Sequence, residues 1–304
     1  MNKIIVIAGP TGVGKTKLSI ELAKLYNGEI INADSMQIYK ELNIGTAKIK
    51  EEEKENIPHH LFDIKKVTED YSIYNYQKDC RALIDEILKK EKTPILVGGT
   101  GLYIKSALYD YKLDYHNNTN TYDNLTIEEL YQKLISIDKE IEGHIDINNK
   151  RRLINAINYY ENNNTSIIHN KTNKLLYDVI FIGLTTPRVN LYNIINNRVD
   201  KMIQEGLLEE VSTFHKEKIY TKPLTGGIGY KEIYEYLDDK VSLEDAIDNI
   251  KRNSRRYAKK QYTFFNHQLP IKWFETDYNN FSNTIKEICK YIDNINKKKG
   301  WDKR

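Results

Sequence analysis

A glycine-rich segment near the N-terminus has the residue types and spacing of a phosphate-binding loop. It consists of Gly9, Pro10, Thr11, Gly12, Val13, Gly14, Lys15 and Thr16, which fit G-x-x-x-x-G-K-[ST] at every position. Glycines let backbone N–H groups turn towards phosphate oxygens, the Lys15 ammonium offsets their charge, and the Thr16 hydroxyl is suited to Mg²⁺. An ordinary glycine-rich turn is the alternative, but the segment lies between an expected buried strand and an expected helix. We therefore predict phosphate binding, with Mg²⁺ as the cofactor.

A carboxylate follows a second expected strand. ATPases and GTPases usually carry an acid at the end of an apolar strand, where it holds Mg²⁺ and orients water. Here the strand over residues 93–97 runs into Gly98 and Gly99, and the strand-end acid is Asp34, on another strand. In an open parallel sheet, the second substrate binds in the crevice at the carboxyl ends of the strands. Asp34 follows such a strand end, so we predict that it acts on an acceptor. The competing interpretation makes Asp34 the N-cap of a helix over residues 35–39.

A parallel sheet would bring these residues together. Residues 3–8, 29–33 and 93–97 are β-branched, apolar runs typical of buried strands, and residues 16–26 and 72–90 have the apolar spacing of helices. The alternation predicts the α/β class, with a P-loop NTPase-like parallel sheet core flanked by helices.

The pattern changes in the middle of the chain. Residues 126–137 and 151–160 have helical spacing without buried-strand runs, and residues 179–184 then return to the sheet. This predicts an all-helical insertion domain over residues 113–175. The core is then discontinuous and comprises residues 1–112 and 176–304, mainly helical after residue 190.

Composition excludes several classes of protein. The 304 residues include 46 Lys and Arg against 43 Asp and Glu, a formal charge of +3, which excludes a polybasic or highly charged disordered chain. Cys80 and Cys289 are isolated, so neither a disulfide framework nor a zinc site is expected. Apolar runs are too short for a membrane span or a signal sequence. We expect a cytoplasmic monomer that does not bind membranes.

Seven blocks of sequence, in order, resemble those of the bacterial tRNA dimethylallyltransferase family, also called tRNA isopentenyltransferases. They are residues 9–16, 32–39, 44–48, 58–63, 96–103, 227–232 and 255–263. The blocks span nearly the whole chain, so the resemblance is specific as a set. It implies transfer of the dimethylallyl group of dimethylallyl diphosphate to N6 of adenosine 37, with release of diphosphate, in tRNAs that read codons beginning with U.

The resemblance also implies roles for individual residues. The glycine-rich loop and Arg198 would hold the diphosphate, with Mg²⁺ at Thr16. Asp34 would take a proton from N6, and Thr100 would orient the adenine. Contacts to tRNA, through the anticodon stem-loop, are expected from Asp34, Ser35, Met36, Gln37, Thr100, Arg151, Arg152, Arg255, Lys259 and Lys260. Asn155, Asn158 and Ile194 stand where the family commonly has Arg, Glu and Arg.

A basic stretch supports the RNA interpretation. Residues 251–272 contain seven Lys or Arg and no Asp or Glu, which leaves the rest of the chain net acidic. A helical wheel places Lys251, Arg252, Arg255, Arg256, Lys259 and Lys260 opposite Ile247, Ile250, Tyr257 and Phe265. A charge run is usually a solvated face. Its one-sided placement and the family resemblance favour binding to a phosphate backbone.

Three other functions stay open at this point. A P-loop small-molecule kinase would turn over ATP without RNA, a relative that prenylates free adenine nucleotides would have less use for the insertion and the basic helix, and a non-catalytic, phosphate-gated RNA-binding paralogue would bind without transfer.

Overall fold

The computed structural model describes residues 3–111, 113 and 122–298, and the chain divides into two compact units. The first unit comprises Met1–Ala107 and Tyr177–Arg304, and the second comprises Leu108–Leu176. Residues 108–111 and 176, predicted as part of the core, fall in the second unit.

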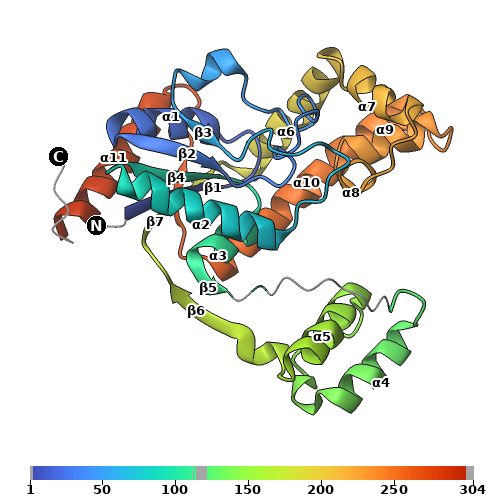
Figure 1. Cartoon of the computed structure of the whole chain (residues 1–304). Coiled ribbons are helices and arrows are strands. Elements are labelled where there is room, and N and C mark those ends of the chain that lie inside the picture. The colour runs from blue at the N-terminus through green and yellow to red at the C-terminus, as the bar shows by residue number, and fades with distance from the viewer. Residues whose placement is uncertain (1–2, 112, 114–121, 299–304) are drawn as a thin grey trace. The chain divides into compact units, whose positions relative to one another are not determined.

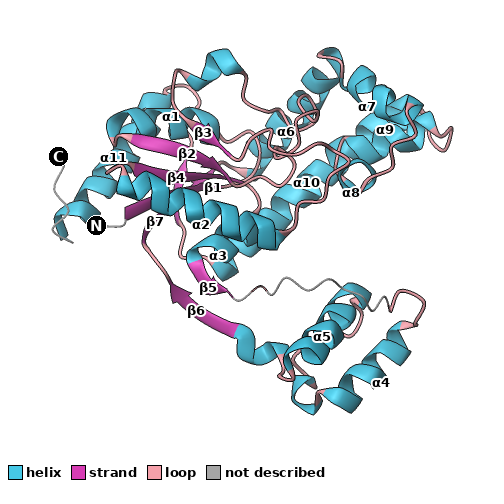
Figure 2. Ribbon diagram, viewed as in Figure 1, coloured by secondary structure: helices cyan, strands magenta, loops and turns pink. Residues whose placement is uncertain are grey.

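The described part of the first unit contains a six-stranded sheet in the order β3-β2-β4-β1-β7-β8 (Figure 2). Every strand pair is parallel. The strands are β1 Lys3–Ala8, β2 Gly28–Asn32, β3 His59–His60, β4 Thr93–Gly98, β7 Asp178–Thr185 and β8 Lys272–Glu275. Residues 4–8 of the central strand β1 are fully buried, as its apolar run predicts. The predicted α/β class with a parallel sheet core is confirmed.

Helices cover both faces of this sheet (Figure 1). Helices α1 Lys15–Leu25 and α11 Phe281–Lys298 lie on one face, and α2 Ile73–Lys89 lies on the other. The other helices of the first unit are α3 Gly101–Leu108, α6 Arg188–Gln204, α7 Leu207–Lys216, α8 Lys222–Gly226, α9 Tyr230–Leu237 and α10 Leu243–Gln268, with a 3₁₀ turn at Glu51–Lys54. Leu18 and Leu22 of α1 join Ile288 and Ile292 of α11 in one apolar core with β1 and β7. On the other face, Tyr76 of α2 is buried and donates a hydrogen bond to the Asn32 carbonyl at 3.0 Å.

The strand register gathers three loops at one edge of the sheet. Ala8 of β1 pairs with Gly98 of β4, and Asn32 of β2 pairs with Val97 of β4. Because these strands are parallel, the loops that follow β1, β2 and β4 all leave from their carboxyl ends. The glycine-rich loop, Asp34 and Thr100 therefore start from neighbouring points, although they are far apart in the sequence.

The end of β4 has space only for glycine. A Cβ atom at Gly98 would lie 2.2 Å from the carbonyl carbon and oxygen of Ala33, well inside any tolerated contact. No carboxylate side chain fits where ATPases and GTPases usually place their acid. The close approach of the two backbones explains physically why that acid is missing here.

The second unit is built on two helices. Helices α4 Ile127–Ile137 and α5 Lys150–Asn163 share a core that includes Leu130, Leu134 and Leu153, with 3₁₀ turns at Lys139–Ile141 and Ile167–Asn170. Strand β5 Tyr109–Tyr111 pairs antiparallel with β6 Lys171–Leu175. The expectation of an all-helical insertion is corrected by β6, whose polar sequence has no apolar strand signal.

No helix within residues 3–111 and 122–298 combines the length and the apolar character that a membrane span requires.

Replacing Gly98 by Ala should destabilise the protein, because the added methyl group meets the Ala33 backbone, which cannot rotate away. We expect a loss of roughly 1–3 kcal/mol in the free energy of unfolding, measured by urea denaturation. Gly226→Ala is the matched control, since its Cβ would meet nothing within 4 Å. Equal stability of the two variants would contradict the steric argument.

Candidate active site

A cavity of about 1160 Å³ opens in the first unit at the carboxyl ends of the strands. Its lining includes the predicted residues Thr11, Gly12, Gly14, Lys15, Thr16, Asp34, Ser35, Met36, Gln37 and Arg198. Gly9, Pro10 and Val13 are buried parts of the same loop. The structure thus brings the predicted phosphate loop and residues 34–37 to one cavity, whereas Thr100 is not among its lining residues.

The glycine-rich loop depends on backbone conformations that favour glycine. Gly12 has φ +83° and Gly14 has φ +91°, both in the left-handed region. A Cβ at Gly12 would also lie 2.4 Å from Cγ2 of Ile194 on α6. The loop is therefore tightly curved and closely backed, as a backbone cradle for phosphate requires.

The two cations of the cavity, Lys15 and Arg198, both have lowered pKa values. Burial, and after it the nearby Arg198, lower the pKa of Lys15 to about 8, while Asp34 opposes the shift. Burial also lowers the pKa of Arg198, and Asp34 opposes that shift. The Lys15 ammonium donates a hydrogen bond to the Pro10 carbonyl at 2.6 Å. An anion between Lys15 and Arg198 would relieve their repulsion.

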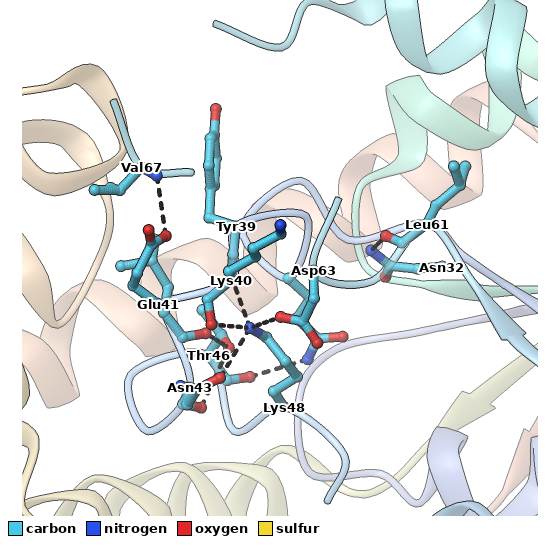
Figure 3. Close-up of polar contacts among 12 residues, drawn as sticks. Asn32, Tyr39, Lys40, Glu41, Asn43, Thr46, Lys48, Leu61, Asp63 and Val67 are labelled. Atoms are coloured by element: carbon cyan, nitrogen blue, oxygen red, sulfur yellow. Dashed lines mark hydrogen bonds and ion pairs between the residues drawn. The ribbon is translucent and has the colours of Figure 1, made fainter. Parts of the chain in front are cut away.

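Asp34 is held by its own strand end. The Asn32 side chain accepts a hydrogen bond from the Asp34 N–H at 2.9 Å and donates to the carbonyls of Asp34 and Leu61, each at 3.0 Å (Figure 3 shows Asn32 beside Leu61). Oδ1 of Asp34 accepts from the Met36 N–H at 3.0 Å. Among the described residues, nothing donates a hydrogen bond to Oδ2, which leaves this oxygen available to a substrate.

The alternative role of Asp34 as a helix N-cap is wrong. Residues 35–39 form turns rather than a helix. The hydrogen bond from the Met36 N–H closes a local turn at Asp34 instead.

Thr100 lies beside this turn. Its hydroxyl accepts a hydrogen bond from the Ser35 N–H at 3.1 Å and donates to the Ser35 Oγ at 3.3 Å. Tyr257 of α10 is 42% exposed and lines the cavity. Desolvation inside the cavity and the nearby Asp34 together raise the pKa of Tyr257 to about 12, and a hydrogen bond with Thr100 opposes the shift. The helical wheel assigns Tyr257 to the apolar face and so misses this site; a tyrosine among basic residues was the available signal.

The basic face of α10 divides into two groups. Lys251 pairs with Asp200 of α6 at 2.6 Å, and Arg255 donates to Oδ1 of Asn196 at 2.6 Å, so both fasten α10 to α6. Lys259 and Lys260 are exposed. Of the predicted tRNA contacts on this helix, these two lysines are the more accessible.

In the second unit, Arg151 and Arg152 are exposed at the start of α5. Arg152 lies 3.9 Å from the Asp146 carboxylate. This exposure leaves both guanidinium groups accessible to an RNA backbone.

The donor set fits Mg²⁺ only together with a phosphate ligand. Within residues 3–111 and 122–298, no three or more His, Cys, Asp or Glu side chains form a metal-binding group. The Thr16 hydroxyl lines the cavity next to Lys15. Mg²⁺ commonly takes one or two protein oxygens and completes its coordination with phosphate oxygens and water, and this arrangement suits that mode.

Binding of inorganic diphosphate should weaken as pH rises through about 8, where Lys15 of the free protein loses its proton. Bound diphosphate favours the ammonium form and raises the pKa of Lys15, so binding above that pH takes up a proton. Affinity then falls by up to about tenfold per pH unit, which titration calorimetry measures.

The Lys15→Arg variant serves as the reference, because its guanidinium stays charged and its profile reports only the titration of diphosphate. If wild type and variant had the same pH profile, Lys15 would not be the titrating group.

Comparisons with known proteins identify the family of this chain. The family model described as IPP transferase matches residues 37–268. The tRNA dimethylallyltransferase of Anoxybacillus flavithermus is 46% identical over 299 residues, covering 96% of each chain. That of Geobacillus thermodenitrificans is 45% identical over 302 residues, covering 95% of this chain and 96% of its own.

Solved structures show the same relationship. The full-length tRNA isopentenylpyrophosphate transferase of Bacillus halodurans has a TM-score of 0.76 and 40% identity, covering 99% of this chain and 98% of its own. A eukaryotic dimethylallyltransferase acting on tRNA has a TM-score of 0.82 and 30% identity, covering 96% of this chain and 80% of its own. The predicted resemblance is confirmed, and the chain belongs to the IPP transferase family.

Proposed function

We propose that this chain is a tRNA dimethylallyltransferase, which transfers the dimethylallyl group of dimethylallyl diphosphate to N6 of adenosine 37 and releases diphosphate. The observation that carries this proposal is the shared cavity of the phosphate loop and Asp34. The end of β4 has no space for the acid that serves ATP and GTP hydrolysis. This combination favours a bound diphosphate that leaves, with a carboxylate facing the acceptor.

The two cations of the cavity act on the leaving group. As the allylic C–O bond breaks, negative charge grows on the diphosphate. Lys15 and Arg198, which both line the cavity, would stabilise that charge. When bound at Thr16 and the diphosphate oxygens, Mg²⁺ would supply further positive charge there.

The acceptor side belongs to Asp34. The lone pair of adenine N6 is delocalised into the ring, so N6 is a poor nucleophile until its proton is removed. As the new C–N bond forms, Oδ2 of Asp34 accepts that proton. Thr100, hydrogen-bonded to Ser35 beside Asp34, orients the same base.

The RNA must present a single base to this cavity. Extruding a base from an anticodon loop costs a few kcal/mol, which contacts to the phosphate backbone have to offset. The exposed Lys259 and Lys260 of the first unit and Arg151 and Arg152 of the second supply cations for such contacts.

Asp34→Asn should lower the rate of prenyl transfer by about 10²- to 10⁴-fold, because the amide cannot take the N6 proton. RNA affinity should change little. The assay uses purified protein, Mg²⁺, labelled dimethylallyl diphosphate and an anticodon stem-loop with adenosine at positions 36 and 37.

Asp248→Asn, an exposed site on α10, makes the same chemical change as a control. The proposed function would be wrong if wild-type protein labelled AMP as well as the stem-loop, consumed ATP without labelling RNA, or bound RNA without any transfer. Unchanged turnover in Asp34→Asn would remove Asp34 from the mechanism alone.

Replacing both Lys259 and Lys260 by Ala should weaken stem-loop binding and reduce the slope of log K against log salt by roughly 1 to 2, since each lysine that neutralises a phosphate adds about one unit to that slope. Fluorescence anisotropy at several salt concentrations measures it. Lys286→Ala with Lys290→Ala removes the same charge from exposed positions on α11 and should leave the slope unchanged. Equal slopes in both double variants would place the RNA elsewhere.

A further inference from the structure

Residues 43–48 form a loop that faces the cavity, and we call it the clamped loop. Lys48 holds it from inside, with its side chain only 5% exposed. The ammonium pairs with Oδ1 of Asp63 at 2.6 Å and donates to the Tyr39 carbonyl at 2.7 Å and to Oδ1 of Asn43 at 2.9 Å (Figure 3). One buried cation thus ties together three parts of the chain between residues 39 and 63.

Glu210 of α7 holds the same loop from the other side. Its Oε2 accepts hydrogen bonds from the N–H groups of Asn43 at 3.1 Å and Ile44 at 2.8 Å. Its Oε1 accepts from the Gly45 N–H at 3.2 Å and from the hydroxyl of the fully buried Tyr230 at 2.7 Å. Four donors therefore converge on a single carboxylate.

Two side chains that line the cavity donate hydrogen bonds to the same carbonyl oxygen of the clamped loop. The Thr46 carbonyl accepts hydrogen bonds from Nε2 of Gln37 at 3.1 Å and from Nη2 of Arg198 at 3.2 Å. Arg198 lies on the diphosphate side of the cavity and Gln37 beside Asp34. The position of this carbonyl sets the direction of both side chains.

The loop conformation needs external support. Ala47 has φ +42°, and Asp63, the partner of Lys48, has φ +55°. Residues other than glycine rarely adopt this region, and surrounding contacts must hold them there. The contacts of Lys48 and Glu210 meet that need.

We propose that Glu210 is a positioning residue: through the clamped loop it fixes the Thr46 carbonyl, and so aligns Arg198 for the diphosphate and Gln37 for the target base. Only the part of this inference that concerns Gln37 and the target base rests on the proposed function. Asp34 depends on Asn32 rather than on this loop, so Glu210 governs the binding of both substrates and leaves the proton transfer intact.

The test is Glu210→Gln, which keeps the shape of the side chain and replaces one acceptor oxygen by an amide that cannot accept from its donors. We expect KM for dimethylallyl diphosphate and for the stem-loop each to rise roughly tenfold, the size of a lost charge-assisted hydrogen bond. The value of kcat should fall by a smaller factor, because a misaligned Arg198 stabilises the leaving diphosphate less. Inorganic diphosphate, measured by calorimetry without RNA, should lose affinity by a similar factor.

Glu209→Gln is the matched control, one residue earlier on α7 and exposed. A double-mutant cycle sharpens the result: Glu210→Gln and Gln37→Ala should be non-additive in the KM for RNA, whereas Glu210→Gln and Lys259→Ala should be additive. A folded Glu210→Gln protein with the kinetics and diphosphate affinity of Glu209→Gln would overturn the proposal, as would a lower Tm with both KM values unchanged.

A second variant and a second measurement test the proposal if Glu210→Gln does not fold or if no prenyl transfer is seen. If Glu210→Gln does not fold, Tyr230→Phe, which removes one hydrogen bond to the same carboxylate, should raise both KM values in the same direction by a smaller factor. If the wild-type protein transfers no prenyl group, the proposed function fails, and the diphosphate measurement still tests the link from Glu210 to Arg198.

Discussion

The site depends on two cations, Lys15 and Arg198, that share a single cavity with one carboxylate, Asp34. Arg198 and burial lower the pKa of Lys15, and burial lowers the pKa of Arg198, so a polyanion that enters between them gains from both. Asp34 compensates part of that charge, yet its Oδ2 stays available. A molecule that carries diphosphate at one end and reacts at the other suits this arrangement better than one that presents two anions.

The sheet positions Asp34 by bringing the end of β4 into close contact with the backbone that follows β2. Gly98 allows the end of β4 to touch the backbone after β2, and the Asn32 side chain then fixes the main chain on both sides of Asp34. The space that an acid on β4 would occupy is filled by backbone. The carboxylate, Asp34, instead follows β2, one strand further from β1 and its phosphate loop.

The sequence predicted the central strands well, because buried parallel strands are long apolar runs. It also predicted the phosphate loop, because the spacing of its glycines reflects the backbone conformations that the loop requires. It did not predict β3, β5, β6 and β8, which are short or polar and are stabilised by pairing with strands distant in the sequence. Local pattern also misplaced Tyr257 and could not reveal Glu210, an ordinary helical glutamate until its four donors, three of them backbone N–H groups, are brought to it by the fold. Such roles arise from tertiary contacts and leave no local signal.

The most direct measurement is a crystal structure of the protein with dimethylallyl thiodiphosphate, whose C–S bond resists cleavage, and an anticodon stem-loop carrying adenosine 37. The diphosphate should lie within hydrogen-bond distance of both Lys15 and Arg198, and N6 of the extruded adenine should lie about 2.6–3.2 Å from Oδ2 of Asp34. An adenine that approaches the prenyl carbon with Asp34 turned away would contradict the account.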